Sequence, residues 1–161
     1  MVGIALYTDN MSKQMIPVKL TATNSLINQI FDYFNNFSVE LGGALGIKDG
    51  VISAFYGVRN TDKDRKSYSP SFDDLNAADA YFESLGMSFV GIIHSHPIGS
   101  FGSGSSIPSK EDIDFFRSFS ETNNDFEYLL FPIITINNNK KVIVWYIWKD
   151  DALKEIDVTT M

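Results

Sequence analysis

The segment VGIIHSHPIGSFGSGSSIPSKEDIDFF, residues 90–116, contains both histidines of the chain. His94 and His96 end an apolar run, and a stretch rich in glycine and serine separates them from the signals of a helix start. In an extended strand, residues i and i+2 point to the same face, about 6.6 Å apart. The two imidazoles can therefore lean together at the end of a buried strand, while Ser95 points the other way.

Such a pair has two interpretations: histidines hydrogen-bonded at a strand end, or ligands of one metal ion. Two imidazoles on one face can bind zinc at Zn–N distances of about 2.0–2.1 Å. The chain has no cysteine and no third histidine, so a catalytic zinc site would need a carboxylate ligand and a water. Asp112 is the best candidate, three residues after Ser109. Ser-x-x-Asp is also typical of a capping box at a helix start.

Composition limits the classes of function. A chain of 161 residues with 44% hydrophobic residues can bury a core, and we expect a single domain over 1–161 with its motif-bearing core at about 16–148. The net charge of -7 disfavours nucleic acid and acidic membranes as partners. No run approaches the roughly 18 apolar residues of a membrane span, and we expect a cytoplasmic protein.

The remaining sequence predicts alternating helices and strands without internal repeats. Asp49-Gly50 favours the tight turn of a hairpin, because both residue types tolerate positive φ. The segment 141–148 is apolar on both faces, which predicts a central strand or an interface, and the tail after Trp148 carries no further signal. The expected elements are strands at 16–20 and 88–93, helices at 25–37, 73–86 and 109–120, a hairpin at 42–58, and an antiparallel pair at 128–136 and 141–148.

These motifs together resemble the JAB/MPN metalloproteases, also called JAMM proteins. The family signature is a glutamate before a glycine-rich strand, then His-Ser/Thr-His-Pro, then Ser-x-x-Asp. The same order occurs here, with Glu40 before the glycines at 42 and 43, then residues 94–97, then residues 109–112. The resemblance extends from the first expected helix to Trp148, and the small size is similar to that of prokaryotic members.

The resemblance implies a fold and a site. It implies an α/β fold in which a curved, mostly antiparallel sheet packs between helices. It implies one Zn²⁺ per chain, held by His94, His96 and Asp112 with a water as the fourth ligand. Glu40 would be the general acid and base, and Ser109 would donate a hydrogen bond to the oxyanion of the reaction.

The resemblance also implies an activity and partners. The protein would be a zinc-dependent peptidase or isopeptidase that cleaves after the C-terminal Gly-Gly of a ubiquitin-like protein, in deconjugation or precursor processing. Its partners would be such a protein or its conjugate, and E1- or E2-like conjugation enzymes. Two alternatives remain: a non-catalytic MPN-type scaffold and a DNA-repair-associated relative, although the net charge of -7 disfavours the second.

One feature departs from the family pattern. Twelve residues separate His96 from Ser109, which is more than is usual in the family. Glycines alternate with serines in this loop, a composition typical of flexible segments. We expect residues 99–106 to be mobile in the free enzyme and to close over the bound substrate.

Overall fold

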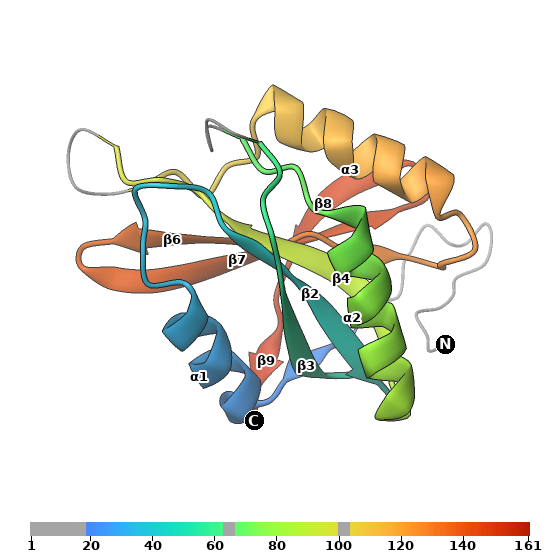
Figure 1. Cartoon of the computed structure of the whole chain (residues 1–161). Helices are drawn as coiled ribbons and strands as arrows, with labels where there is room; N and C mark the ends of the chain where they lie inside the picture. The colour runs from blue at the N-terminus through green and yellow to red at the C-terminus, as the bar shows by residue number, and fades with distance from the viewer. Residues whose placement is uncertain (1–18, 63–66, 100–103) are drawn as a thin grey trace.

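The computed structural model describes residues 19–62, 67–99 and 104–161, which form nine strands and three helices (Figure 1). The helices are α1 (Asn24–Tyr33), α2 (Phe72–Ser84) and α3 (Lys110–Thr122). The strands are β1 (Thr21–Ala22), β2 (Gly42–Lys48), β3 (Val51–Val58), β4 (Ser88–Ser95), β5 (Leu129–Leu130), β6 (Ile133–Asn137), β7 (Lys140–Lys149), β8 (Ala152–Ile156) and β9 (Thr159–Thr160).

The hairpin of β2 and β3 is the centre of the sheet. Its turn residues Asp49 and Gly50 have φ values of 53° and 79°, as a tight primed turn requires, so the predicted hairpin is confirmed. On its other edge β2 pairs antiparallel with β4, and Gly42 lies opposite His94. The glycine-rich strand therefore ends beside the histidine pair.

All nine strands join one mostly antiparallel sheet in the order β5-β7-β6-β4-β2-β3-β1-β9, with β8 added beside β7. The parallel pairs are β1 with β3 and β9, and β4 with β5 and β6. Strand β7 has neighbours on both sides, since it pairs with β5 and β6 and with β8. Of the two expectations for 141–148, a central strand or an interface, the central strand is observed for 145–148, where β8 pairs with β7.

Helices cover both faces of the sheet. Leu26 and Ile30 of α1 pack in one hydrophobic cluster, whereas Phe82 of α2 and Phe116 of α3 pack in another. Side chains of strand β4 point alternately to the two faces of the sheet, so Ile93 packs in the first cluster and Ile92 in the second. The predicted helices at 73–86 and 109–120 are confirmed to within two residues. No helix in the described ranges is long and apolar enough to cross a membrane.

Two predictions near the start of the described chain were wrong in their bounds. Of the expected strand at 16–20, residues 16–18 lie outside the described residues, and the strand that does form is β1. Helix α1 ends at Tyr33 instead of residue 37. Phe34 and Phe37 are nevertheless buried, so the apolar spacing that suggested a longer helix reflects burial of the segment after it.

Two further corrections concern the last third of the chain. The expected strand at 128–136 is divided into β5 and β6, because Pro132 lacks the amide hydrogen that a continuous ladder uses. The tail after Trp148 is not featureless, since it forms β8 and β9. A turn at Asp150 and Asp151, with φ values of 55° and 59°, folds β8 back onto β7.

Candidate metal centre

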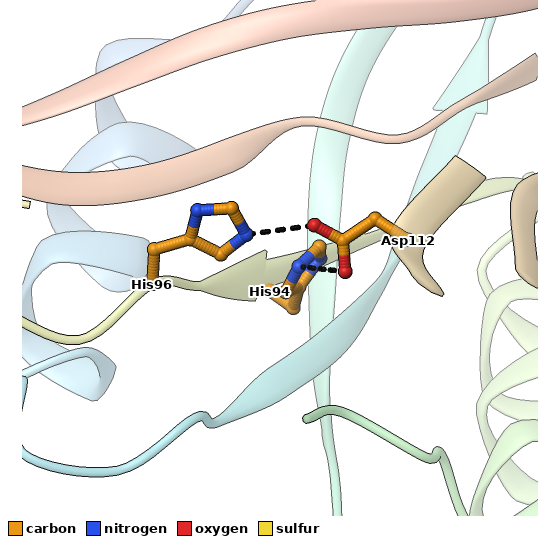
Figure 2. A group of neighbouring side chains, drawn as sticks. All are labelled: His94, His96 and Asp112. Atoms are coloured by element: carbon orange, nitrogen blue, oxygen red, sulfur yellow. Dashed lines mark hydrogen bonds and ion pairs between the residues drawn. The ribbon is translucent and has the colours of Figure 1, made fainter. Parts of the chain in front are cut away.

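Three side chains from two elements meet at one end of β4. His94 lies in the strand, His96 follows its last residue, and Asp112 lies in the first turn of α3. Nε2 of His96 is 2.8 Å from Oδ2 of Asp112, and Nε2 of His94 is 3.2 Å from Oδ1 (Figure 2). One ligand atom from each residue lies within 4.8 Å of the others, so the structure brings the three predicted metal ligands together.

The local structure explains this meeting. Alternation along β4 turns His94 to the α3 face, with its ring 6.2 Å from the Phe116 ring, and turns Ser95 to the opposite face. Helix α3 begins with a capping box, in which the Asp112 amide donates to Ser109 Oγ at 3.0 Å and the Ser109 amide donates to Asp112 Oδ2 at 2.9 Å. The cap therefore fixes the carboxylate that faces the imidazoles, so the capping role of Ser-x-x-Asp is compatible with a metal-binding one.

The chemistry of these groups fits a bound metal ion. The three residues are buried, at 3% exposure for His94 and 8% for each of the other two. Nε2 of His94 does not have hydrogen-bond geometry to any group in the described part of the chain, although Asp112 is near. A buried polar atom without a partner is costly, and an imidazole nitrogen beside a carboxylate is a donor set that suits zinc.

Electrostatics favour the metal-binding protonation states of His94 and Asp112, whereas the Asp112 carboxylate favours protonation of His96. Burial lowers the pKa of His94, which keeps its imidazole neutral. Burial alone would also lower the pKa of His96, but the hydrogen bond and charge of Asp112 outweigh it and raise that pKa. Burial would raise the pKa of Asp112, yet its contacts with both imidazoles hold that pKa well below the usual range. Asp112 is therefore ionised at neutral pH, as a metal ligand must be.

The loop after His96 orients its ring. Nδ1 of His96 lies 2.7 Å from the carbonyl oxygen of Ser105, a partner typical of metal-binding histidines because it leaves Nε2 to the metal. The next carbonyl, of Ser106, accepts a hydrogen bond from the Tyr146 hydroxyl at 2.8 Å. The Gly104 amide donates to the Ile136 carbonyl. Of the loop expected to be mobile, residues 100–103 lie outside the described residues, and the main chain of 104–106 is hydrogen-bonded to β6, His96 and β7.

Tyr68 covers the other ligand. Its ring stacks on the His94 ring at 5.8 Å between centroids and 6° between planes, and its hydroxyl donates to the Val58 carbonyl at 3.0 Å. A Cβ at Gly42 would lie 2.1 Å from the Tyr68 ring, so only glycine at that position admits the tyrosine. The glycine after Glu40 thus has a packing reason that is linked to the site.

Glu40 shares a cleft with the ligands. The cleft has a volume of about 750 Å³ and is lined by Glu40, His96, Ser109 and Asp112 among others. Burial raises the Glu40 pKa to about 7, and the positive charge of His96 opposes that shift. Oε1 of Glu40 is buried and has no hydrogen-bond partner among the described residues. A carboxylate with this pKa is suited to exchange protons near neutrality.

Sequence reasoning found all five of these residues but missed the groups that support them. Tyr68 belongs to a segment that is polar and loop-like in sequence, and the Ser105 contribution is a main-chain carbonyl. Neither has a side-chain signature in the sequence.

Comparisons with known proteins concern the fold. No protein-family profile and no curated protein sequence matches the chain. Among solved structures, protein DSY2949 from Desulfitobacterium hafniense is similar, with a TM-score of 0.67 and 20% identity over 88% of this chain and 92% of that one. AF2198, a JAB1/MPN domain protein from Archaeoglobus fulgidus, is similar with a TM-score of 0.51 and 17% identity, over 89% of this chain and 98% of that one.

At these identities the likeness extends to the fold alone. The chain therefore has an α/β fold like that of a JAB1/MPN domain protein, with a buried His94, His96 and Asp112 group that could bind a metal ion.

Proposed function

We propose that this protein is a zinc-dependent peptidase or isopeptidase that cleaves after the C-terminal Gly-Gly of a ubiquitin-like protein. The observation that carries the proposal is the buried His94, His96 and Asp112 group with Glu40 in the same cleft. A capping aspartate needs no histidines beside it. A hydrogen-bonded histidine pair needs no glutamate with a raised pKa in the same cleft, yet Glu40 is such a residue. The combination supports a hydrolytic metal site.

Each residue has a distinct task in this proposal. His94, His96 and Asp112 would hold zinc, which supplies Lewis acidity that activates water and polarises a carbonyl. Glu40 would accept a proton from the attacking water and pass it to the leaving amine. Ser109 accepts the Asp112 amide hydrogen through Oγ, and its own hydroxyl hydrogen remains to stabilise the oxyanion.

The substrate class follows from the family resemblance and agrees with an open cleft beside a sheet, where an extended tail can lie. The deconjugation and precursor reactions both break an amide bond after Gly-Gly, so one site serves both. A ubiquitin-like protein with a short extension after Gly-Gly, and a dimer joined by an isopeptide bond, are the two probes.

Glu40→Gln tests the proposal. The variant should retain zinc and fold, and lose about 10²–10⁴-fold in turnover, because only proton transfer is removed. Glu83→Gln, at an exposed position of α2, is the matched control and should keep full turnover. Zinc content by elemental analysis and product by mass spectrometry are the measurements. A wild-type protein that binds zinc but cleaves neither probe would contradict the proposed reaction.

A further inference from the structure

Ser95 lies between two metal-ligand candidates but faces away from them. Its side chain is completely buried, at 0% exposure. Its Oγ accepts a hydrogen bond from the Leu41 amide at 2.9 Å and lies 3.4 Å from the Val39 carbonyl oxygen. Leu41 and Val39 are the two neighbours of Glu40, so one hydroxyl contacts the peptide groups on both sides of that residue.

This contact replaces part of the β ladder. A hydrogen-bonded antiparallel pair normally exchanges two main-chain hydrogen bonds. The Ser95 amide does donate to the Leu41 carbonyl at 2.9 Å, but the Leu41 amide is accepted by the Ser95 side chain. On its other edge β4 pairs with β6, where the His94 amide donates to the Pro132 carbonyl and the His96 amide to the Ile134 carbonyl. Beyond the β2–β4 ladder, the hydroxyl and the Ile98 amide, which donates to the Phe37 carbonyl at 2.8 Å, keep the Glu40 segment attached.

The Glu40 side chain has little hydrogen bonding to hold it, because its buried Oε1 lacks a partner among the described residues. Its main chain is held from two sides. Asn60 Nδ2 donates to the Glu40 carbonyl at 3.0 Å, and Ser95 contacts the flanking peptides. The position of the carboxylate in the cleft therefore depends on how firmly this segment is fixed.

We propose that Ser95 is a positioning residue for Glu40, in which the buried hydroxyl fixes the main chain on both sides of the general base and holds its carboxylate beside the metal ligands. The inference rests on the proposed hydrolase function. Small displacements of a reacting group cost large factors in rate, so the hydroxyl acts on turnover without contacting the substrate.

The kinetic test is a double-mutant cycle with Ser95→Ala and Glu40→Ala. Ser95→Ala should retain about one zinc per chain and lose about 10–10²-fold in kcat, with KM little changed. In the Glu40→Ala background it should cause no further loss, because its effect passes through the missing carboxylate. Ser95→Thr keeps a hydroxyl and should recover most of the turnover. Multiplicative losses in the double variant would overturn the proposal.

A second readout does not use activity. Amide hydrogen exchange by NMR on the zinc-free protein should show the Leu41 amide exchanging at least about 10-fold faster in Ser95→Ala, while interior β2 amides keep their protection. Unchanged Leu41 exchange would overturn the positioning role even in an active enzyme. A wild-type enzyme inactive on both probes would overturn the hydrolase function instead, and with it the catalytic part of the inference.

Discussion

Helices α2 and α3 begin with the same pattern, a capping serine followed by an aspartate three residues later. In α2 the Asp74 amide donates to Ser71 Oγ at 3.2 Å, and in α3 the Asp112 amide donates to Ser109 Oγ at 3.0 Å. The two carboxylates then differ. Asp74 accepts from the Arg59 guanidinium at 2.8 Å, whereas Asp112 faces two buried imidazoles.

The difference shows that the pattern makes a helix cap and that its surroundings make a site. The Asp74 side chain is 20% exposed beside Arg59, which is 75% exposed, so this pair is a surface interaction. The Asp112 side chain is 9% exposed and lies where β4 ends. Two serine N-caps at different places in the fold give matched controls for tests of the metal centre.

The largest expected effect separates the two aspartates. Asp112→Asn should abolish zinc retention, because the amide cannot supply the anionic oxygen that completes the ligand set. Asp74→Asn should retain about one zinc per chain. Elemental analysis after gel filtration measures both. Equal zinc in the two variants would remove Asp112 from the site and leave it as an ordinary cap.

The two serines give the next largest effect. Ser71→Ala and Ser109→Ala should each destabilise the protein by about 1 kcal/mol, because each removes an N-cap. Only Ser109→Ala should also lose turnover, by about 10²–10³-fold, since it removes an oxyanion donor as well. Chemical denaturation and steady-state kinetics measure the two quantities. If the turnover losses match, Ser109 is a cap and nothing more.

The Ser105 carbonyl oxygen, which lies 2.7 Å from His96 Nδ1, supports the candidate centre and has no counterpart at the Asp74 cap. A Cβ at Gly104 would lie 1.9 Å from Thr135 Oγ1, so Gly104→Ala should shift this carbonyl. Zinc affinity should fall by about 10–100-fold, the usual effect of losing such a partner. Ser106→Ala keeps the loop backbone and should bind zinc normally. Competition with a chelator measures the affinities, and an unchanged Gly104→Ala value would show that the carbonyl is dispensable.

The smallest effect concerns pH. Arg59 lowers the pKa of Asp74, whereas burial raises that of Glu40 from 4.5 to about 7. Between pH 4.5 and about pH 7, Glu40 of the folded zinc-free protein binds a proton that Glu40 of the unfolded chain does not. The stability of the folded protein therefore falls as the pH rises through this window. Glu40→Gln removes the effect.

The stability of the zinc-free Glu40→Gln protein relative to wild type should therefore increase by about 1–2 kcal/mol when the pH is raised from 4 to 8. Denaturant unfolding in the presence of a chelator measures this difference, with Glu83→Gln as the control. A stability difference that is the same at both pH values would contradict the raised pKa.

Elements with strong local signals could be predicted from the sequence, and elements without them could not. Local signals predicted the Asp49-Gly50 turn, helices α2 and α3 and strand β4, because the residues concerned determine their own backbone. They did not predict β8 or β9: β9 has two residues, and β8 follows a turn of two aspartates that lacks the usual glycine. Such strands depend on a partner that is distant in sequence.

The site shows the same division. His94, His96, Asp112, Glu40 and Ser109 are side chains in an ordered motif, so their resemblance to the family was visible. The Ser-x-x-Asp of α2 has the same letters, and only the path of the chain distinguishes the two. The Tyr68 stacking on His94 and the Ser105 carbonyl arise from tertiary contacts, which no local pattern records.

The most direct test of the central claim is to locate zinc in a crystal by anomalous scattering at the zinc edge. We predict one strong peak per chain at the end of β4, about 2.0–2.2 Å from the imidazole nitrogens of His94 and His96 and from a carboxylate oxygen of Asp112. No peak should occur beside Asp74. A zinc-soaked crystal without density between these three residues, or with zinc bound only elsewhere, would contradict the account.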